Sequence, residues 1–155
     1  MDKIIIVGAG HAGGKLTQYL FQNNFNGEVL LFGDENYSPY ERPPLSKSFL
    51  SNKKKINEFS LLNSEIYENK NYSFKLDNKI YKIDTENKKV YDLDGSYYNY
   101  DKIIFANGAS PKKITIKNSE KFYYLRTIDD SINIRSHLES VKNLAIIGGG
   151  FIGLE

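Results

Sequence analysis

The sequence predicts an α/β protein built around a parallel β-sheet, and three observations lead to this fold class. Short apolar runs rich in β-branched residues recur at 4–7, 29–32 and 103–106. Uninterrupted runs of this kind are typical of parallel strands that are covered on both faces. The first run enters a glycine-rich turn, after which apolar residues recur at helical spacing. A second apolar run with the same turn returns at 144–153.

The composition excludes several classes of function. The chain has 155 residues and a formal net charge of +2, which does not favour nucleic acid as a partner. It lacks a signal peptide and any apolar stretch near the ~18 residues that span a bilayer, so we expect a cytoplasmic protein without membrane contact. It has no cysteine, which excludes disulfides, iron–sulfur ligation and thiolate catalysis from this chain. No metal site is predicted.

The first elements form a βαβ unit. Residues 4–7 are predicted as a strand, residues 11–23 as an amphipathic helix and residues 29–32 as a second strand. The helix is expected to stop at Asn26-Gly27, since both residues tolerate the left-handed conformation. Residues 36–50 are expected to be irregular and then helical, and residues 56–70 weakly helical.

The middle of the chain switches to strands. Residues 79–84 and 88–93 are predicted as a hairpin, and Asp94-Gly95 as the next turn. Residues 103–106 are predicted as another buried strand that ends in a turn at Asn107-Gly108.

The last third mixes a short strand with a helix. The strand is expected around residues 123–125 and the helix from Asp129 onward. Asp129 or Asp130 can cap the helix, and Ile132 and Leu138 are expected to supply its apolar face.

The chain carries one glycine motif twice. Each copy follows four apolar strand residues, 4–7 or 144–147, and has the pattern G-x-G-x-x-G. The first glycine makes the tight turn, the second lets the backbone approach a pyrophosphate, and the third lets helix and strand pack closely. The copies consist of Gly8, Gly10 and Gly13 and of Gly148, Gly150 and Gly153.

The first copy has the full context of a dinucleotide site. Asp34 lies 21 residues after Gly13, close to the spacing expected for an acid that accepts ribose hydroxyls. The alternative for Asp34 is an acid in a surface turn. Too few residues follow the second copy for us to expect a helix there. Two such motifs suggest two cofactors with electrons passing between them.

Longer strings add a resemblance to a family. The string "YSPYERPPLSK" at residues 37–47 stands with "VGAGHAGG", "GDE", "YDKIIFANGASP", "YLRTIDD" and "IIGGGFIGLE". Together they resemble the N-terminal part of ferredoxin–NAD(+) reductases of the putidaredoxin-reductase and rubredoxin-reductase type, similar also to apoptosis-inducing factor. Asn107 departs from the family, which usually has threonine there.

The resemblance implies a Rossmann-like FAD-binding fold with a β-meander insertion, followed by the truncated start of a second, NAD-binding domain. Residues 1–115 correspond to the FAD-binding domain, and residues 116–155 to the incomplete start of the NAD(P)-binding domain. Members run to roughly 400 residues, several domains by size. We therefore expect a gene fragment, a partial reading frame or an engineered piece.

The resemblance also implies the cofactor-binding residues. Arg42 would meet the anionic or adenosine part of FAD, Ile80 the adenine through its backbone, and Arg126 FAD again. The alternative for Arg42 is a surface salt bridge, and that for Ile80 is a plain position in a strand core. The alternative for Arg126 is a structural cation at the start of a helix. The complete set is Gly8, Ala9, Gly10, His11, Ala12, Gly13, Asp34, Glu35, Arg42, Lys47, Ile80, Ala106, Arg126, Gly148, Gly149, Gly150, Phe151, Ile152 and Gly153.

The resemblance implies two catalytic residues, Lys47 and Glu155. The lysine would lie near the flavin N5 atom, and the glutamate would orient it and meet the nicotinamide amide. The alternative for Lys47 is an ordinary exposed lysine.

The implied activity is that of a flavoprotein oxidoreductase that passes a hydride from NAD(P)H to FAD. Because the chain has no cysteine, the electrons are expected to leave directly for a ferredoxin-type iron–sulfur protein or another small acceptor. Two alternatives are a non-catalytic FAD- or NADH-binding protein and an inactive truncated fragment.

Overall fold

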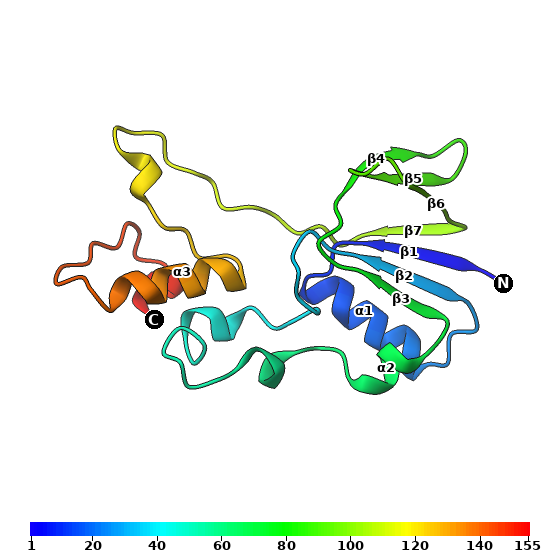
Figure 1. The fold of residues 1–155 in the computed structure, drawn as a ribbon, viewed down its shortest axis with the longest axis horizontal. Helices are drawn as coiled ribbons and strands as arrows, with labels where there is room; N and C mark the ends of the chain where they lie inside the picture. The colour runs from blue at the N-terminus through cyan, green and yellow to red at the C-terminus, as the bar shows by residue number, and fades with distance from the viewer. The chain divides into compact units, whose positions relative to one another are not determined.

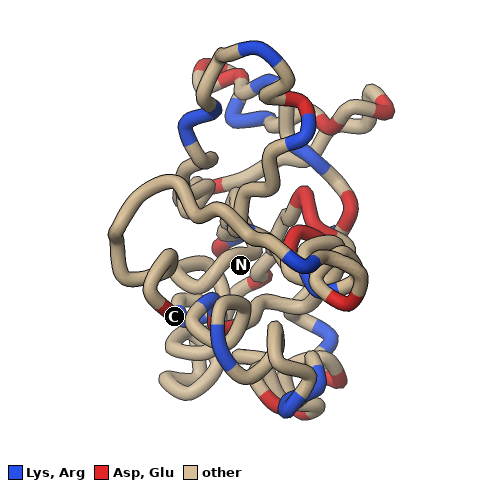
Figure 2. Tube along the Cα trace, turned by 90° about the vertical axis from the view of Figure 1, so that its left-hand side faces the viewer, with Lys and Arg blue, Asp and Glu red and all other residues tan.

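The computed structural model describes all residues from Met1 to Glu155 and forms two compact units, each discontinuous in sequence. Unit 1 comprises residues 1–41 and 60–108, and unit 2 comprises residues 42–59 and 109–155. Basic and acidic residues are interspersed along the chain (Figure 2). None of the helices is long and apolar enough to cross a membrane.

Unit 1 is built on a four-stranded parallel sheet with the order β3-β2-β1-β7 (Figure 1). Its strands are β1 (Lys3–Val7), β2 (Glu28–Phe32), β3 (Tyr72–Lys75) and β7 (Lys102–Phe105). The helix α1 (His11–Gln22) connects β1 to β2, and the short helix α2 (Ser64–Glu68) precedes β3. The predicted α/β fold with a parallel sheet, including its first βαβ unit, is confirmed.

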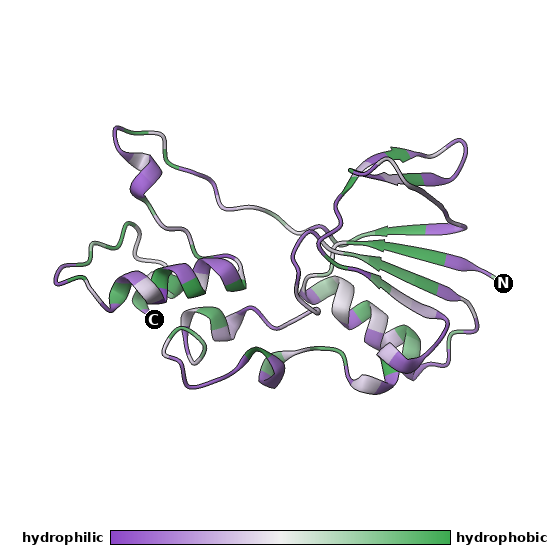
Figure 3. Cartoon of the chain, in the orientation of Figure 1, coloured by the Kyte–Doolittle hydropathy of each residue, from purple (hydrophilic) through white to green (hydrophobic).

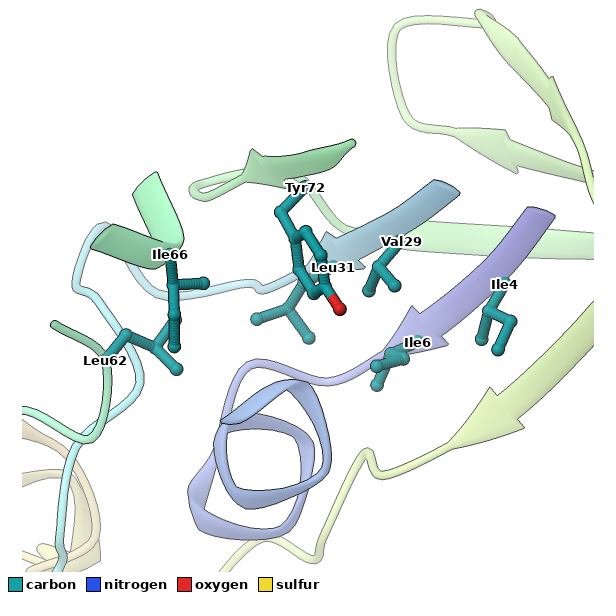
Figure 4. Close-up of a cluster of buried hydrophobic side chains, with 7 residues drawn as sticks. All are labelled: Ile4, Ile6, Val29, Leu31, Leu62, Ile66 and Tyr72. Atoms are coloured by element: carbon teal, nitrogen blue, oxygen red, sulfur yellow. The ribbon is translucent and has the colours of Figure 1, made fainter. Parts of the chain in front are cut away.

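The two central strands, β1 and β2, are apolar on both faces and are covered on both sides (Figure 3). Ile4 and Ile6 point to the face that α1 covers, where they pack in one cluster with Val29 and Leu31 (Figure 4). Ile5 points to the opposite face and is fully buried in a second cluster. Alternating directions of successive side chains explain why the predicted strands contain no polar residues.

The opposite face is covered by a three-stranded antiparallel meander. It consists of β4 (Ile80–Asp84), β5 (Lys89–Asp92) and β6 (Tyr97–Asn99). Val90 of β5 is fully buried in the same cluster as Ile5. The turns contain Lys88 and Gly95, both with positive φ. The predicted hairpin, second turn and meander insertion are therefore confirmed.

Unit 2 contains short helices and extended segments. The 3₁₀ turns are η1 (Pro43–Ser46), η2 (Ile56–Phe59) and η3 (Ser119–Lys121), and the α-helices are α3 (Ile128–Leu138) and α4 (Phe151–Leu154). The buried hydroxyl of Ser131 on α3 donates to the carbonyl oxygen of Leu45 at 2.8 Å. Arg135 on α3 donates to the carbonyl oxygen of Phe49 at 3.2 Å and lies over its ring. Two residues of α3 therefore hold η1 and the segment that follows it.

The prediction of how α3 begins was wrong. Its N-cap is Thr127, whose side chain accepts from the N–H of Asp130, while the Asp130 carboxylate accepts from the N–H of Thr127. This reciprocal arrangement is a capping box, in which the acid occupies the third helical position. The predicted apolar face was also wrong, because Ile132 and Leu138 are each 37 % exposed whereas Ile128 is buried.

Two predicted strands are absent. Residues 123–125 and 144–147 have extended or irregular backbone without strand pairing. Leu144, Ile146 and Ile147 are 60–66 % exposed. A strand exists only when a neighbour supplies its hydrogen bonds, and an apolar run does not by itself provide that neighbour.

Candidate functional site

The first glycine turn lies between β1 and α1. Gly8 has a φ of +114°, and a Cβ atom at this position would lie 2.3 Å from the carbonyl oxygen of Ala106. A Cβ atom on Gly13 would lie 2.0 Å from the carbonyl oxygen of Gly8. The backbone conformation and the close approach of neighbouring segments therefore require glycine at both positions.

The turn presents unsatisfied backbone donors. Gly10 is the N-cap of α1 and offers no side chain, and the first turn contains no acidic residue. The first intrahelical bond runs from the N–H of Gly14 to the carbonyl of Gly10. The N–H groups of His11, Ala12 and Gly13 have no carbonyl partner within the helix. A 12-residue helix with these donors at its N-terminus fits a pyrophosphate group.

Two acidic residues follow β2, and they differ in their surroundings. Asp34 is exposed. The carboxylate of Glu35 accepts from the hydroxyl of Tyr40 at 2.5 Å, and Tyr40 is 2 % exposed. Sequence reasoning missed Tyr40, since no motif links it to Glu35. A Cβ atom on Gly33 would lie 2.5 Å from Cβ of Ala9, so the acidic turn packs against the glycine turn.

Two further predicted site residues lie in unit 1. Ala106 directly follows β7, and its N–H donates to the carbonyl of Val7 at 2.8 Å, which holds it beside the glycine turn. Ile80 begins β4 and packs against the core cluster on the meander side. Unit 1 thus brings the glycine turn and Ala106 together. Ile80 lies in a strand and contacts the core, which is the alternative that the sequence allowed for this residue.

The two predicted arginines contact each other in unit 2. The guanidinium of Arg42 donates to the carbonyl oxygen of Arg126. Both border a small hollow, whose lining residues are Arg42, Leu45, Ser46, Leu125, Arg126 and Ile152. Arginine side chains can pair with a phosphate or another anion, and the guanidinium of Arg42 is already engaged by one carbonyl.

The two predicted catalytic residues also meet in unit 2. Nζ of Lys47 lies 3.0 Å from Oε1 of Glu155, with exposed side-chain fractions of 54 % and 28 %. The hydroxyl of Ser46 donates to Oε2 of the same carboxylate at 2.5 Å. The donors Ser46 and Lys47 together hold the pKa of Glu155 below its usual value. Sequence reasoning missed Ser46, although it stands next to Lys47.

The second glycine turn repeats the geometry of the first. Gly148 has a φ of +105°, and a Cβ atom on Gly153 would lie 2.6 Å from the carbonyl oxygen of Gly148. Gly150 is the extended N-cap of the four-residue helix α4. The expectation that no helix follows this copy was wrong, because α4 begins at Phe151, the position that matches the start of α1.

A family model, described as pyridine nucleotide-disulphide oxidoreductase, matches residues 2–155. This match covers both glycine turns and the segments between them. The chain belongs to the pyridine nucleotide-disulphide oxidoreductase family. Within this family, the predicted resemblance to ferredoxin and rubredoxin reductases is confirmed by the relatives described next.

Two curated relatives come from Pseudomonas putida. A rubredoxin-NAD(+) reductase is 40 % identical over 98 % of this chain and 40 % of its own length. The ferredoxin–NAD(+) reductase component of a p-cumate 2,3-dioxygenase system is 36 % identical over 100 % of this chain and 39 % of its own length. The chain thus spans about 40 % of the length of these relatives.

Solved structures agree with the sequence relatives. A covalent putidaredoxin reductase–putidaredoxin complex matches with a TM-score of 0.89 and 31 % identity over 99 % of this chain and 38 % of the matched chain. A ferredoxin reductase from Rhodopseudomonas palustris matches with a TM-score of 0.91 and 31 % identity over the same shares. The similarity to apoptosis-inducing factor and the division into domains 1–115 and 116–155 stay predictions.

Proposed function

We propose that this chain provides the FAD-binding part of an NAD(P)H-dependent reductase of the ferredoxin reductase type. The observation that carries the proposal is the repeated glycine turn, with φ values of +114° at Gly8 and +105° at Gly148. Two turns of this kind suit two dinucleotides, one for each redox cofactor. The names of the relatives support a reductase that uses NAD and delivers electrons to a small redox protein.

The residues of unit 1 fit the adenosine and pyrophosphate parts of FAD. The free N–H groups at the start of α1 would hold the pyrophosphate, because a helix N-terminus attracts anions. The exposed carboxylate of Asp34 would accept the ribose hydroxyls. Glu35 would help mainly by shaping the turn, since its carboxylate already accepts from Tyr40.

Lys47 and Glu155 are proposed to serve the reacting part of the flavin. FAD, when bound, accepts a hydride from the nicotinamide and passes electrons on singly to an acceptor. The ammonium group of Lys47 would stabilise the negative charge that arrives on the flavin ring. Glu155 would orient Lys47 through their ion pair. No proton has to leave either residue for this role.

The proposed acceptor is a ferredoxin-type iron–sulfur protein or another small electron acceptor, and the proposed location is the cytoplasm. No cysteine of this chain can relay electrons, because the chain has none. The rival function is non-catalytic binding of FAD or NADH. The binding residues would be the same, so only turnover separates the two functions.

The test uses the whole polypeptide that is encoded by the gene carrying this chain, hereafter the gene product. The gene product is purified, and NADH or NADPH is added without oxygen while the flavin absorption is followed. Bleaching that is reversed by a ferredoxin or by an artificial one-electron acceptor is the expected result. A stable flavin complex that neither nucleotide bleaches would favour the binding protein instead.

A further inference from the structure

Two adjacent residues engage both oxygens of one carboxylate. The hydroxyl of Ser46 donates to Oε2 of Glu155 at 2.5 Å, while Nζ of Lys47 lies 3.0 Å from Oε1. Ser46 and Glu155 are 109 residues apart in the sequence. The Lys47–Glu155 pair therefore has a third member.

The hydroxyl of Ser46 has one competing acceptor. The carbonyl oxygen of Pro43 lies 3.4 Å away, at the outer limit of a hydrogen bond. Hydrogen bonds from a hydroxyl to a carboxylate are shorter and about twice as strong as bonds between neutral groups. Since the hydroxyl has one hydrogen to donate, Glu155 is the favoured partner.

The backbone around Ser46 is held in place from two sides. The carbonyl of Leu45 accepts from the buried hydroxyl of Ser131 on α3. The N–H of Lys47 donates to the carbonyl of Pro44 at 3.0 Å. Ser46 therefore presents its hydroxyl from a fixed segment, whereas the side chain of Lys47 is long and more than half exposed.

We infer that Ser46 is a positioning residue, whose hydroxyl fixes the Glu155 carboxylate so that Glu155 in turn holds Lys47. This inference rests on the proposed role of Lys47. Lys47 alone could meet Glu155 in many geometries, because both side chains are flexible and partly exposed. A second donor on the other oxygen selects one orientation of the carboxylate, and with it one position of the ammonium group.

The cations near Glu155 favour the ionised carboxylate that Ser46 is inferred to position. Lys47 is the cation paired with Glu155 in the structure, and Arg42 and Arg126 line the hollow that Ser46 and Ile152 also border. Donation from Ser46 and then from Lys47 lowers the pKa of Glu155. Both donors favour the ionised form, so loss of the Ser46 hydroxyl must raise the pKa of Glu155.

The first experiment measures that pKa directly and does not depend on turnover. The gene product is labelled with ¹³C-glutamate, Glu155→Gln assigns the signal, and the carboxyl carbon is titrated. Ser46→Ala is expected to raise the pKa of Glu155, Ser46→Thr to restore it, and the matched control Ser51→Ala to leave it unchanged. Ser51 is exposed, and its hydroxyl makes only a 3.4 Å bond to the carbonyl of Ser48 within its own turn. An unchanged pKa in Ser46→Ala would overturn the inference.

A second variant covers the case in which Ser46→Ala does not fold. In Lys47→Met the ion pair is gone but the Ser46 hydroxyl remains. A Glu155 pKa that stays below its usual value in this variant supports the inference. A return to the usual value would show that Lys47 alone accounts for the shift.

The kinetic experiment connects the residue to the reaction. Flavin bleaching by NADH is followed over a range of pH, and Ser46→Ala is expected to slow it roughly 3- to 10-fold, less than the loss of a whole bond to a charged group, because Lys47 keeps its ion pair with Glu155. The acid limb of the pH–rate profile should move to higher pH in this variant, because a raised pKa means that Glu155 is protonated at a higher pH. If NADH does not bleach the flavin of the wild-type protein, the proposed function is contradicted. The titration of Glu155 then tests the positioning role of Ser46 by itself. Normal wild-type bleaching with an identical Ser46→Ala profile would contradict the inference alone.

Discussion

At the scale of single residues, the predicted site divides into backbone positions and side-chain positions. Gly8 and Gly148 both adopt positive φ, as a G-x-G-x-x-G turn requires. These positions were predictable because the reason for glycine is local. Tyr40 and Ser46 were missed, since Tyr40 has no motif that links it to Glu35, and Ser46 meets Glu155 only when distant segments fold together.

Replacement of Lys47 tests the side-chain chemistry. Lys47→Met in the gene product should slow flavin reduction by NADH about 10²-fold, as expected when a preorganised charge is removed from a site of developing charge. FAD should stay bound, because the proposed binding groups for its pyrophosphate lie elsewhere. Stopped-flow absorption measures the rate. A rate equal to that of the wild type would mean that Lys47 is an ordinary exposed lysine.

Replacement of Gly8 tests the backbone geometry. Gly8→Ala should weaken FAD binding at least about tenfold, because a left-handed conformation costs an L-residue roughly 1–2 kcal/mol and the new Cβ would also meet the carbonyl oxygen of Ala106. That contact would be 2.3 Å. Gly95→Ala is the matched control, with a φ of +83° and no atom within 4 Å of its Cβ position. FAD titration followed by fluorescence should show normal binding in the control. Equal affinities in the two variants would contradict the close-approach argument.

At the scale of elements, the sequence predicted a strand correctly where the burial of that strand is recorded in its own apolar residues. The run of β7 forms a parallel strand as predicted, but it lies at the sheet edge and is not buried, since Phe105 is 58 % exposed. The prediction of buried parallel strands is confirmed for the apolar runs of β1 and β2, because both faces of each strand are covered. It failed at residues 144–147, which have the same composition but no neighbouring strand. The start of α3 was predicted wrongly for a similar reason. Thr127 and Asp130 are both good capping residues, and only the folded backbone shows which of them is the N-cap.

The contact of α3 with the Lys47 segment gives a prediction about stability. Ser131→Ala should lower the free energy of unfolding by about 1–3 kcal/mol, because the buried carbonyl of Leu45 loses its donor. Ser136→Ala on the same helix is the control, since Ser136 is exposed and its hydroxyl bonds only within the helix, to Asn133 and His137. Thermal or denaturant unfolding of the gene product measures both. Equal stabilities would show that α3 does not hold this segment.

At the scale of the whole molecule, the gene product should purify yellow with FAD held without a covalent bond. The first glycine turn and its helix donors suit reversible binding, and the chain has no cysteine that could attach the flavin. His11 begins α1 at the first glycine turn, and His137 on α3 packs against Tyr123. After heat denaturation and centrifugation, the flavin should remain in the supernatant. Flavin that sediments with the protein would contradict the prediction.

The 155-residue polypeptide by itself should bind FAD far more weakly than a reductase of the relatives' full length does, and it should not oxidise NADH. Three of its apolar side chains near the second turn, those of Phe151, Ile152 and Leu154, are 60–88 % exposed. The run before them lacks strand partners, and α4 has only four residues, so the second turn lacks a stable helix to complete a nucleotide site.

Exposed apolar surface of this kind also favours association between copies. The first βαβ unit should nevertheless persist, because its strands and α1 pack in one buried cluster that Leu62, Ile66 and Tyr72 complete. FAD titration by fluorescence quenching, followed by anaerobic addition of NADH, tests the prediction on the purified polypeptide. Tight binding with rapid bleaching would contradict it, because the residues 1–155 would then suffice for both cofactors and for hydride transfer between them.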